Sequence, residues 1–511
     1  MKKAFIALSV IVLCVTTLQS CGDEDIFSFD DKVVHVAKAG GLAQALLFSN
    51  LAAIRELTIS GEIDSRDFVT IRDRMTKLRT LNISNVTIAA YKGFEGSGGS
   101  NVYEYLANTI PIYAFYNPIT ATSLVTLSDI RFPESLQSVG ASAFAGCTGL
   151  TALNLPNSLH KIELRAFARC TGLSGKLSIP AKVDTIGYSA FTFCSGFNAL
   201  QLSDSLLFIG ESAFNGCSGF QGTLNLPTKV NKIKDRAFQN CYGLSAINIP
   251  ASVSDIGNYA FQDCGCPVNV VAENTSFSSI DGVLFDAGQI TLKYFPSKKS
   301  GIYNIPTSVM IIDNAVFSNC KNLTSISIPT SVMAIGDYAF RDCSAISGTF
   351  IIPNSVFAIG IFAFEGCKNI SNFSVAVDNS SFTSVNGVIY DITLTTLVQY
   401  PLAKGGNYDI SNTTTTIAQG AFMGAESLNS INIPASVTGI GDRAFMNCTG
   451  LTTIRNFATS PVQFIDGLKI TSWSVFDNIN KSKCVLYVPV NTKSAYQNAN
   501  QWKDFRNIIE M

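Results

Sequence analysis

The sequence predicts a β-rich solenoid of about 12 stacked coils, each of 23 or 24 residues, with a cap at each end. Two observations predict this fold class. The string A-F-x-x-C recurs at a nearly constant spacing, and an L-x-L-P segment with alternating apolar residues precedes most copies. A repeat of this length is one supersecondary unit that cannot bury its apolar face alone, so neighbouring copies must stack.

The phenylalanine of A-F-x-x-C marks each coil. Copies lie 23 or 24 residues apart, except for one spacing of 29 at the start and two gaps of 56 and 58. Phe115 belongs to a degenerate first copy. We expect the core to contain Phe144, Phe167, Phe191, Phe214, Phe238, Phe261, Phe317, Phe340, Phe364, Phe422 and Phe445.

The full unit is LxxLxLPxSVxxIGxxAFxxCxx, and Leu150, Leu153 and Leu155 open the clearest copy. Period-2 alternation in L-x-L predicts a short strand. Pro156 ends that strand because proline cannot donate to a β-ladder. The S-V-x-x-I-G block predicts a second extended piece, glycines such as Gly187 supply a turn, and A-F-x-x-C closes the coil.

The LxxLxLP, SVxxIG and AFxxC blocks, which span about residues 110–457, resemble those of BspA-like (Treponema-type) leucine-rich repeat proteins of bacterial surfaces. The resemblance implies a leucine-rich repeat right-handed superhelix, β-rich and of the α/β type. It also implies an N-terminal cap with divergent repeats over residues 32–109. We expect a C-terminal cap over residues 458–511, where Trp473 and Trp502 pack in the cap or, alternatively, form a sugar platform.

The two long gaps resemble each other. Ser276 to Phe285 matches Ser381 to Tyr390 at an offset of 105 residues, and Phe317 matches Phe422 at the same offset. Strand–turn–strand patterns in both gaps predict hairpin-containing insertions at about 268–305 and 373–411. Each hairpin is either a spacer or a projection that binds a partner.

The N-terminus has the layout of a secretory signal over residues 1–20, with two lysines before an apolar stretch. That stretch, residues 4–18, is too short to span a bilayer. Leu18-Gln19-Ser20-Cys21 resembles the bacterial lipobox, which implies a lipid anchor on Cys21; an ordinary signal peptide is the alternative. Residues 21–31 then form a tether. Its acidic start resembles an outward-export signal of Bacteroides-like surface lipoproteins, although a simple solvated linker also fits.

The composition disfavours several function classes. Lys and Arg number 36 against 37 Asp and Glu, so the chain has no basic excess for a nucleic-acid partner. Only two histidines are present, and no GxSxG, HExxH or GxxxxGK[ST] motif appears. We therefore expect no enzyme, cofactor or metal site, while a glycosidase-like pair of carboxylates stays an open alternative.

Ten cysteines share the last position of A-F-x-x-C. Stacking would place neighbours about 4.8 Å apart, a distance that permits a disulfide. Equivalent side chains point the same way, however, and Ala425 fills one of these positions. We therefore expect a column of reduced thiols that fill space, with Cys264 and Cys266 as the pair most prone to bridge.

The middle residue of each L-x-L faces outward and forms a mostly neutral, hydrogen-bonding stripe on one sheet face, which we expect to be concave. We call these ten residues the strand stripe: Asn154, Ser178, Gln201, Asn225, Asn248, Ser327, Ile351, Ser374, Asn432 and Arg455. They are either binding residues or simply soluble strand positions.

The resulting hypothesis is a non-enzymatic recognition or adhesion protein that binds a macromolecule, such as a host or bacterial surface protein. As an exported lipoprotein it would sit in the outer membrane, attached through the lipid on Cys21 and facing the cell exterior. The alternative is a surface lipoprotein that captures carbohydrate for a nutrient-uptake system. Exposed tryptophan and tyrosine platforms would favour that alternative.

Overall fold

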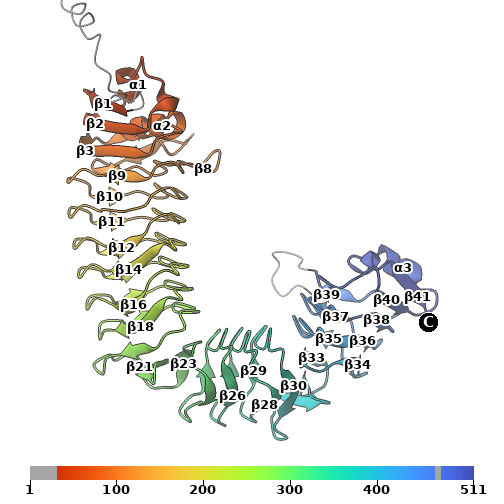
Figure 1. Ribbon diagram of the computed structural model, residues 1–511. Coiled ribbons are helices and arrows are strands. Elements are labelled where there is room, and N and C mark those ends of the chain that lie inside the picture. Colours follow the sequence, from red (N-terminus) through yellow and green to blue (C-terminus); the bar gives the residue numbers. More distant parts are fainter. Residues whose placement is uncertain (1–30, 100, 466–473) are drawn as a thin grey trace, which may run out of the picture.

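The computed structural model describes residues 31–99, 101–465 and 474–511. They form a parallel β-solenoid of about 20 turns with little helix (Figure 1). The expectation of about 12 coils was too low, because it counted only copies of the phenylalanine motif and not the turns of the caps and insertions. The predicted signal sequence, Cys21, most of the predicted tether and Trp473 lie outside the described residues.

Most coils contribute one strand to a first column, formed by the L-x-L segments. Its members are β9 (Asp129–Arg131), β12 (Gly175–Ser178), β14 (Phe197–Gln201), β16 (Gly222–Asn225), β18 (Leu244–Ile249), β20 (Val268–Val270), β24 (Gly301–Asn304), β26 (Leu323–Ser327), β28 (Gly348–Ile352), β30 (Ile370–Val375), β34 (Gly406–Asp409), β36 (Leu428–Ile433), β38 (Thr453–Asn456), β40 (Val485–Val488) and β41 (Asn507–Glu510). The neighbours that are hydrogen-bonded to each other pair in parallel with the repeat in register, so Asn225 lies beside Asn248. The copy at Leu153 and Leu155, for which a strand was predicted, forms no regular strand.

The S-V-x-x-I-G blocks form a second column of shorter strands. These are β6 (Thr109–Ile110), β10 (Ser138–Val139), β11 (Lys161–Ile162), β13 (Thr185–Ile186), β15 (Phe208–Ile209), β17 (Lys232–Ile233), β19 (Asp255–Ile256), β23 (Thr291–Tyr294), β25 (Ile311–Ile312), β27 (Ala334–Ile335), β29 (Ala358–Ile359), β33 (Thr396–Gln399), β35 (Thr416–Ile417), β37 (Gly439–Gly441) and β39 (Gln463–Ile465). The isoleucine of each block points into the core, as Ile186 and Ile209 do.

The A-F-x-x-C segments form a third edge, which we call the turn ladder. Alternate N–H groups of one turn donate to carbonyls of the next coil, such as Phe144 N to Ala166 O at 2.8 Å and Gly146 N to Ala168 O at 2.7 Å. This alternation requires left-handed backbone at the residue before the alanine and at the residue before the cysteine, as at Arg165 (φ 52°) and Arg169 (φ 61°).

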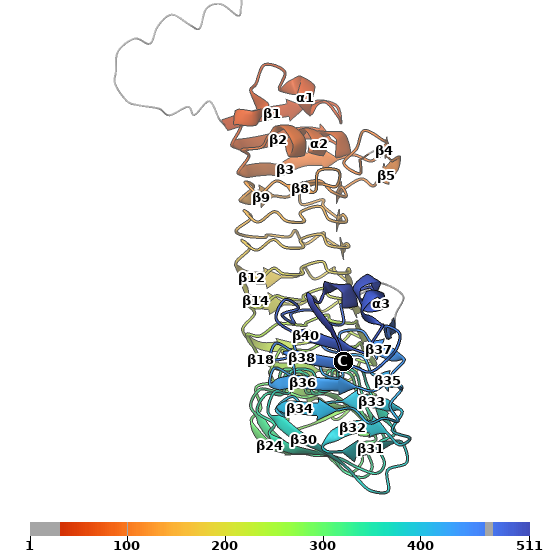
Figure 2. The same ribbon diagram turned by 90° about the vertical axis from the view of Figure 1, so that its right-hand side faces the viewer.

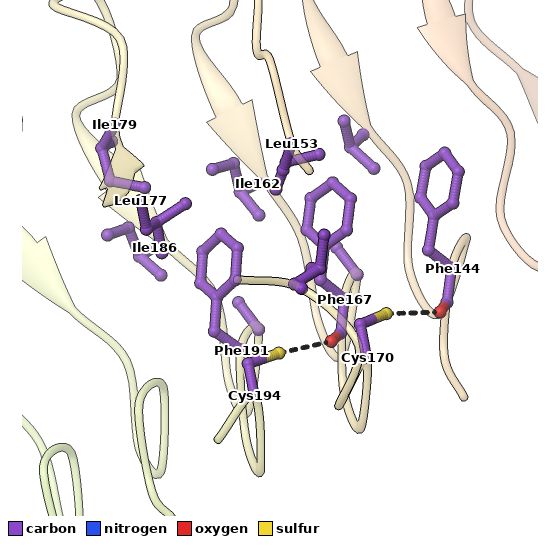
Figure 3. Packing of buried hydrophobic residues seen from close by; sticks show 14 of the residues in the cluster. Phe144, Leu153, Ile162, Phe167, Cys170, Leu177, Ile179, Ile186, Phe191 and Cys194 are labelled. Atoms are coloured by element: carbon purple, nitrogen blue, oxygen red, sulfur yellow. Dashed lines mark hydrogen bonds between the residues drawn. The ribbon is translucent and has the colours of Figure 1, made fainter. Parts of the chain in front are cut away.

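The core is built around stacked phenylalanine rings. None of the phenylalanines predicted to face the core is more than 2% exposed. Ring centroids from Phe144 through Phe167 and Phe191 to Phe214 lie 5.1, 5.3 and 5.5 Å apart and are within 9° of parallel. Figure 3 shows three of these rings beside the inward leucines and isoleucines of the strands.

Two antiparallel hairpins interrupt the stack. The first comprises β21 (Phe277–Ile280) and β22 (Val283–Asp286), and the second comprises β31 (Phe382–Val385) and β32 (Val388–Asp391). The first hairpin continues into β23, which joins the second column by pairing with β25. The second hairpin continues into β33, which pairs with β35 in the same way. The insertions are therefore built into the solenoid rather than attached to it as free projections.

The solenoid bends at both hairpins, so the chain forms a U of three arms (Figure 1). The buried core divides at the same places into three clusters. We call the arms the first arm (β1 to β20), the middle arm (β24 to β30) and the last arm (β34 to β41).

Direct contacts across the turn ladder explain the direction of the first bend. Gln262 Nε2 donates to Ser318 Oγ at 3.3 Å, and Asn319 Nδ2 donates to Asp263 Oδ1 at 2.8 Å, although each pair is 56 residues apart. On the strand side, one sheet ends at β20 and the next begins at β24, with the hairpin inserted between them in sequence. The strand side is therefore longer than the turn side, and the solenoid curves toward the turn ladder.

The second bend has the same construction. Lys368 Nζ lies 2.7 Å from Glu426 Oε1, which is 58 residues away on the next turn. Gly420 packs against the ring of Phe362 so closely that a Cβ atom there would lie 2.5 Å from it. The turn ladder thus forms the inner side of the U at both bends.

The N-terminal cap adds three longer parallel strands, β1 (Asp31–Val36), β2 (Glu56–Ile63) and β3 (Thr80–Ile88). The helix α1 (Leu42–Ala45) ends after one turn, and a 3₁₀ segment, η1 (Leu51–Ala53), follows. A longer helix, α2 (Ser65–Arg74), was not predicted; it has a capping box between Asp64 and Asp67. Two hairpins follow, formed by β4 (Tyr91–Gly93) with β5 (Tyr103–Tyr105) and by β7 (Tyr116–Asn117) with β8 (Thr122–Ser123).

The C-terminal end is closed by α3 (Lys493–Asn498) and η2 (Trp502–Asp504). Trp502 is 1% exposed and donates from Nε1 to the carbonyl of Val462, and Tyr496 donates to the carbonyl of Ala458. These rings close the core, so neither can act as a sugar platform. In the described part of the chain, no helix is long and apolar enough to cross a membrane.

Candidate binding surfaces

The strand stripe lies on the outward side of the first column. None of its ten residues is buried, and Ile351 is 66% exposed. The stripe is not on the inner side of the U, contrary to expectation, because both bends curve toward the turn ladder. Figure 2 shows first-column strands of the first and last arms along the same side of the molecule.

Amide side chains of the stripe hydrogen-bond to one another in the first arm. Asn248 Nδ2 donates to Asn225 Oδ1 at 2.7 Å, and Asn269 Nδ2 donates to Asn248 Oδ1 at 3.0 Å. Each amide in this run offers its remaining donor or acceptor capacity to solvent, since an Asn side chain has two donors and two acceptor sites. The run is therefore a pre-ordered polar surface rather than a set of independent side chains.

The last arm carries a more charged part of the stripe. Asn432 donates to Asp409, and the guanidinium of Arg455 lies 5.2 Å from the ring centroid of Tyr487. Asn269, Asp409 and Tyr487 continue the stripe but were missed, because their coils lie at the insertions or in the cap. Each still sits between two apolar residues of a strand, as in Val268-Asn269-Val270, and that signal could have identified them.

The turn ladder of the first arm carries a groove of about 620 Å³. It begins at the β7–β8 hairpin, which projects toward the inner side of the U (Figure 1), and runs over the turns of four coils. Its lining combines small residues with Arg165, Arg169 and Phe193. This surface could not be predicted from the repeat pattern, because its residues occupy the variable positions of the A-F-x-x-C motif.

The groups that could carry catalysis do not come together. His35 Nδ1 lies 3.2 Å from Ser60 Oγ in the N-terminal cap, whereas His160 is exposed at β11. Among residues 31–99, 101–465 and 474–511, no cluster of His, Cys, Asp and Glu has the arrangement of a metal site. Burial raises the pKa of Asp263, but this carboxylate accepts the hydrogen bond from Asn319 that joins the turns at the first bend.

The twelve cysteines in the described region are buried and free, including Cys264 and Cys266. Burial raises the pKa of the Cys147 and Cys194 thiols to about 12. A thiol with such a pKa is almost fully protonated at neutral pH, and the thiolate is the reactive form. The repeat cysteines are therefore structural.

Comparison with known families agrees with the coil geometry. The pattern described as the BspA type leucine rich repeat region matches in six copies, at residues 108–221, 194–305, 289–399 and 404–467. The chain belongs to this family. BspA type leucine-rich repeats are a non-enzymatic class of repeat, and leucine-rich repeat proteins in general bind macromolecules such as proteins.

Several solved structures are similar to this BspA type protein. A leucine rich cell surface protein of Faecalibacterium prausnitzii is 22% identical, with 79% of this chain and 91% of that chain covered and a TM-score of 0.46. A leucine-rich repeat protein of Eubacterium ventriosum is 20% identical, with 69% and 87% covered and a TM-score of 0.45. One of Bacteroides ovatus is 19% identical, with 76% and 92% covered and a TM-score of 0.34. A comparison with curated protein sequences found no significant match.

Proposed function

We propose that the protein is a cell-surface recognition and adhesion protein that binds a macromolecular partner, a host or bacterial surface protein, without catalysing a reaction. One observation carries the proposal: solvent-accessible, mostly neutral side chains repeat from coil to coil along the first column. The stripe of the first arm, from Asn154 to Asn269, covers six coils and so extends about 25 Å at the spacing of paired strands. That length suits a protein interface of standard size.

The chemistry of the stripe supports a protein partner. The Asn225–Asn248–Asn269 run holds its amides in fixed positions, so binding them costs little further ordering of side chains. Neutral donors and acceptors give specificity through hydrogen bonds, with little long-range steering and weak salt dependence. Carbohydrate capture would need exposed tryptophan or tyrosine platforms, and the burial of Trp502 and Tyr496 weighs against it.

We place the protein in the outer membrane, anchored through a lipid on Cys21 and facing outward. The lipobox-like Leu18 to Cys21 and the acidic residues after it support this placement. Protease treatment of whole cells should degrade the protein, and a Cys21→Ala variant should appear in the soluble fraction. Complete protection of the wild-type protein would contradict outward display.

Capture of surface proteins tests the function. Residues 22–511 should retain one or a few proteins from labelled host or bacterial surfaces, and an Asn225→Arg/Asn248→Arg variant should lose them by placing bulky charges on the stripe. The matched control is Gln221→Arg, which adds the same exposed residue to the same coil, before β16. Equal capture by the stripe variant would contradict the role of the stripe, and capture of glycans alone would favour the carbohydrate alternative.

A further inference from the structure

The groove on the first arm differs from the rest of the turn ladder in charge. Its lining includes two arginines, Arg165 and Arg169, and no acidic residue. Both arginines are exposed, and in the described part of the chain no carboxylate pairs with either guanidinium. Two glutamates of these coils are engaged elsewhere: Glu163 pairs with Lys161 at 2.9 Å, and Glu211 with Arg236 at 3.8 Å.

Aromatic rings hold the two guanidinium groups in place. The Cζ atom of Arg165 lies 5.8 Å from the ring centroid of Tyr188, and that of Arg169 lies 5.6 Å from the ring centroid of Phe193. Stacking on a ring leaves the N–H edge of a guanidinium available to an anion, and that edge matches a carboxylate in two parallel hydrogen bonds. The groove therefore presents two oriented, uncompensated sites for carboxylates.

Two large residues line the groove at a left-handed position of the turn ladder. Arg169 and Phe193 have φ values of 61° and 58°, whereas the equivalent residues of the coils on either side are Gly146 and Gly216, also at positive φ. Glycine adopts this conformation without steric cost, and bulky side chains do not. In the other copies of the A-F-x-x-C motif this position is Gly, Asn or Asp. The two large side chains are therefore placed here at a cost in backbone strain, and both line the groove.

Small polar groups complete the lining. Ser142, Ser189 and Ser212 occupy the same position in three coils, and Ser123 and Asn215 mark the two ends of the groove. Four coils span about 15 Å between their first and last turns, which matches about five residues of extended chain. The β7–β8 hairpin closes one end and limits the length of the occupant.

We propose that this groove binds a short, extended acidic segment of a partner protein, with its carboxylates on Arg165 and Arg169. The inference rests on the proposed recognition function and adds to it a second site and a partner chemistry. A sulfated polysaccharide fits less well, because a regular polyanion requires a row of cations. The groove has only two such cations, because the next arginine of the turn ladder, Arg236, already faces Glu211 and the ring of Tyr259.

Fluorescence anisotropy with folded residues 22–511 tests this site. The probes are fluorescein-labelled hexapeptides of alternating Glu and Ser, their Gln–Ser counterparts, and a heparin hexasaccharide. The Glu peptides should bind, and binding should weaken as salt rises from low to physiological concentration. Arg165→Gln and Arg169→Gln should each weaken it about tenfold, the value of one hydrogen-bonded charge pair. Lys176→Gln is the control, because it removes the same charge from strand β12, which opens the coil that holds Phe193.

Equal affinity of the double arginine variant and the wild type would overturn the inference, as would equal binding of the Gln peptide or binding of heparin alone. Capture of surface proteins separates this inference from the proposed function. If wild-type protein captures partners and the double arginine variant captures them equally, the groove is not the site, although recognition stands. If wild-type protein captures no protein, the proposed function fails, and the peptide titration still decides the groove.

Discussion

The Sγ atom of Cys217 donates a hydrogen bond of 3.1 Å to the main-chain carbonyl of Phe191, one coil earlier. The same carbonyl accepts the N–H of Cys194 within its own coil, also at 3.1 Å. Equivalent thiol bonds start from Cys170, Cys194, Cys241, Cys264, Cys343, Cys367 and Cys448. The thiol is thus a donor between coils as well as a filler, and two of these bonds are drawn in Figure 3.

Replacing Cys217 by alanine should lower the free energy of unfolding by about 1–2 kcal/mol, because the carbonyl of Phe191 loses a donor and a small void forms. Urea denaturation followed by circular dichroism measures the change. Cys484→Ala is the control, because the Cys484 thiol is buried but donates to no carbonyl in the described part of the chain. This variant therefore loses only packing contacts. If Cys484→Ala lowers the free energy of unfolding as much as Cys217→Ala does, the thiol hydrogen bond contributes nothing to stability.

The raised thiol pKa values predict a loss of stability at alkaline pH. The folded-state pKa of Cys147, Cys194 and Cys448 is about 12, above that of an unfolded thiol near 8.5. Because the unfolded state releases these protons first, stability is fully present below pH 8.5 and falls as pH rises from there toward 12. Urea midpoints at pH 7.5, 9 and 10.5 should decrease in that order.

The same burial predicts slow reaction of the thiols with iodoacetamide at pH 8 in the folded protein, followed by full alkylation in urea. Mass spectrometry counts the modified cysteines. Rapid alkylation of the repeat cysteines without denaturant would show that their coils open frequently.

Truncating one ring of the phenylalanine stack should damage the solenoid locally. Phe214→Ala should cost about 3–5 kcal/mol, since the ring is fully buried and lies 5.5 and 5.2 Å from the rings of Phe191 and Phe238. Coils contact only their neighbours, so hydrogen exchange should rise first in the adjacent coils and unfolding should become multi-step. Phe357→Ala, at a side chain 54% exposed, should change little.

Contacts between the turns at the first bend should hold the arms in position. Gln262→Ala with Asn319→Ala removes both side-chain bonds across that bend, so the maximum dimension measured by small-angle X-ray scattering should increase. Removing two bonds of the same kind within a straight arm, by Asn215→Ala, should leave the dimension unchanged. Identical scattering of all three proteins would mean that the hairpin alone sets the bend.

Asp67 should be essential to the N-terminal cap. Its carboxylate accepts the N–H groups of Gly40, Leu42 and Asp64 at 2.7, 2.9 and 2.8 Å, so Asp67→Ala leaves three donors without an acceptor. The expected cost is about 3 kcal/mol or more. Hydrogen exchange should increase over α1 and α2 but not in the last arm. The exposed Glu62→Ala is the control, and an unchanged cap in Asp67→Ala would contradict this role.

Periodicity predicted the repeating part of the fold well. The spacing of A-F-x-x-C located the core rings from Phe144 to Phe445, and the L-x-L segments located the first column. Both could be predicted because the residues that a coil buries lie within 23 consecutive residues. The direction of curvature was wrong. The curvature depends on contacts such as that of Asp263 with Asn319, which join turns 56 residues apart. Such contacts cannot be recognised from the repeat pattern.

The candidate sites were predicted only in part, for a related reason. The strand stripe follows from alternation along a strand, so its exposure could be read from the L-x-L pattern. The groove depends on which turn side chains lie next to each other in space, and the repeat pattern does not show this. The large residues Arg169 and Phe193, at a position that is Gly, Asn or Asp in the other copies, were the available signal.

Each corner of the U contains a copy of the same hairpin segment, and one block of 105 residues separates the two copies. Unequal recombination between the two copies would therefore add or remove one whole corner while leaving every other coil intact. Loss of a block would open the U into an L, and gain of a third would bring the two ends toward closure. The distance between the ends of the protein can thus change greatly in a single genetic event, without the gradual accumulation of substitutions.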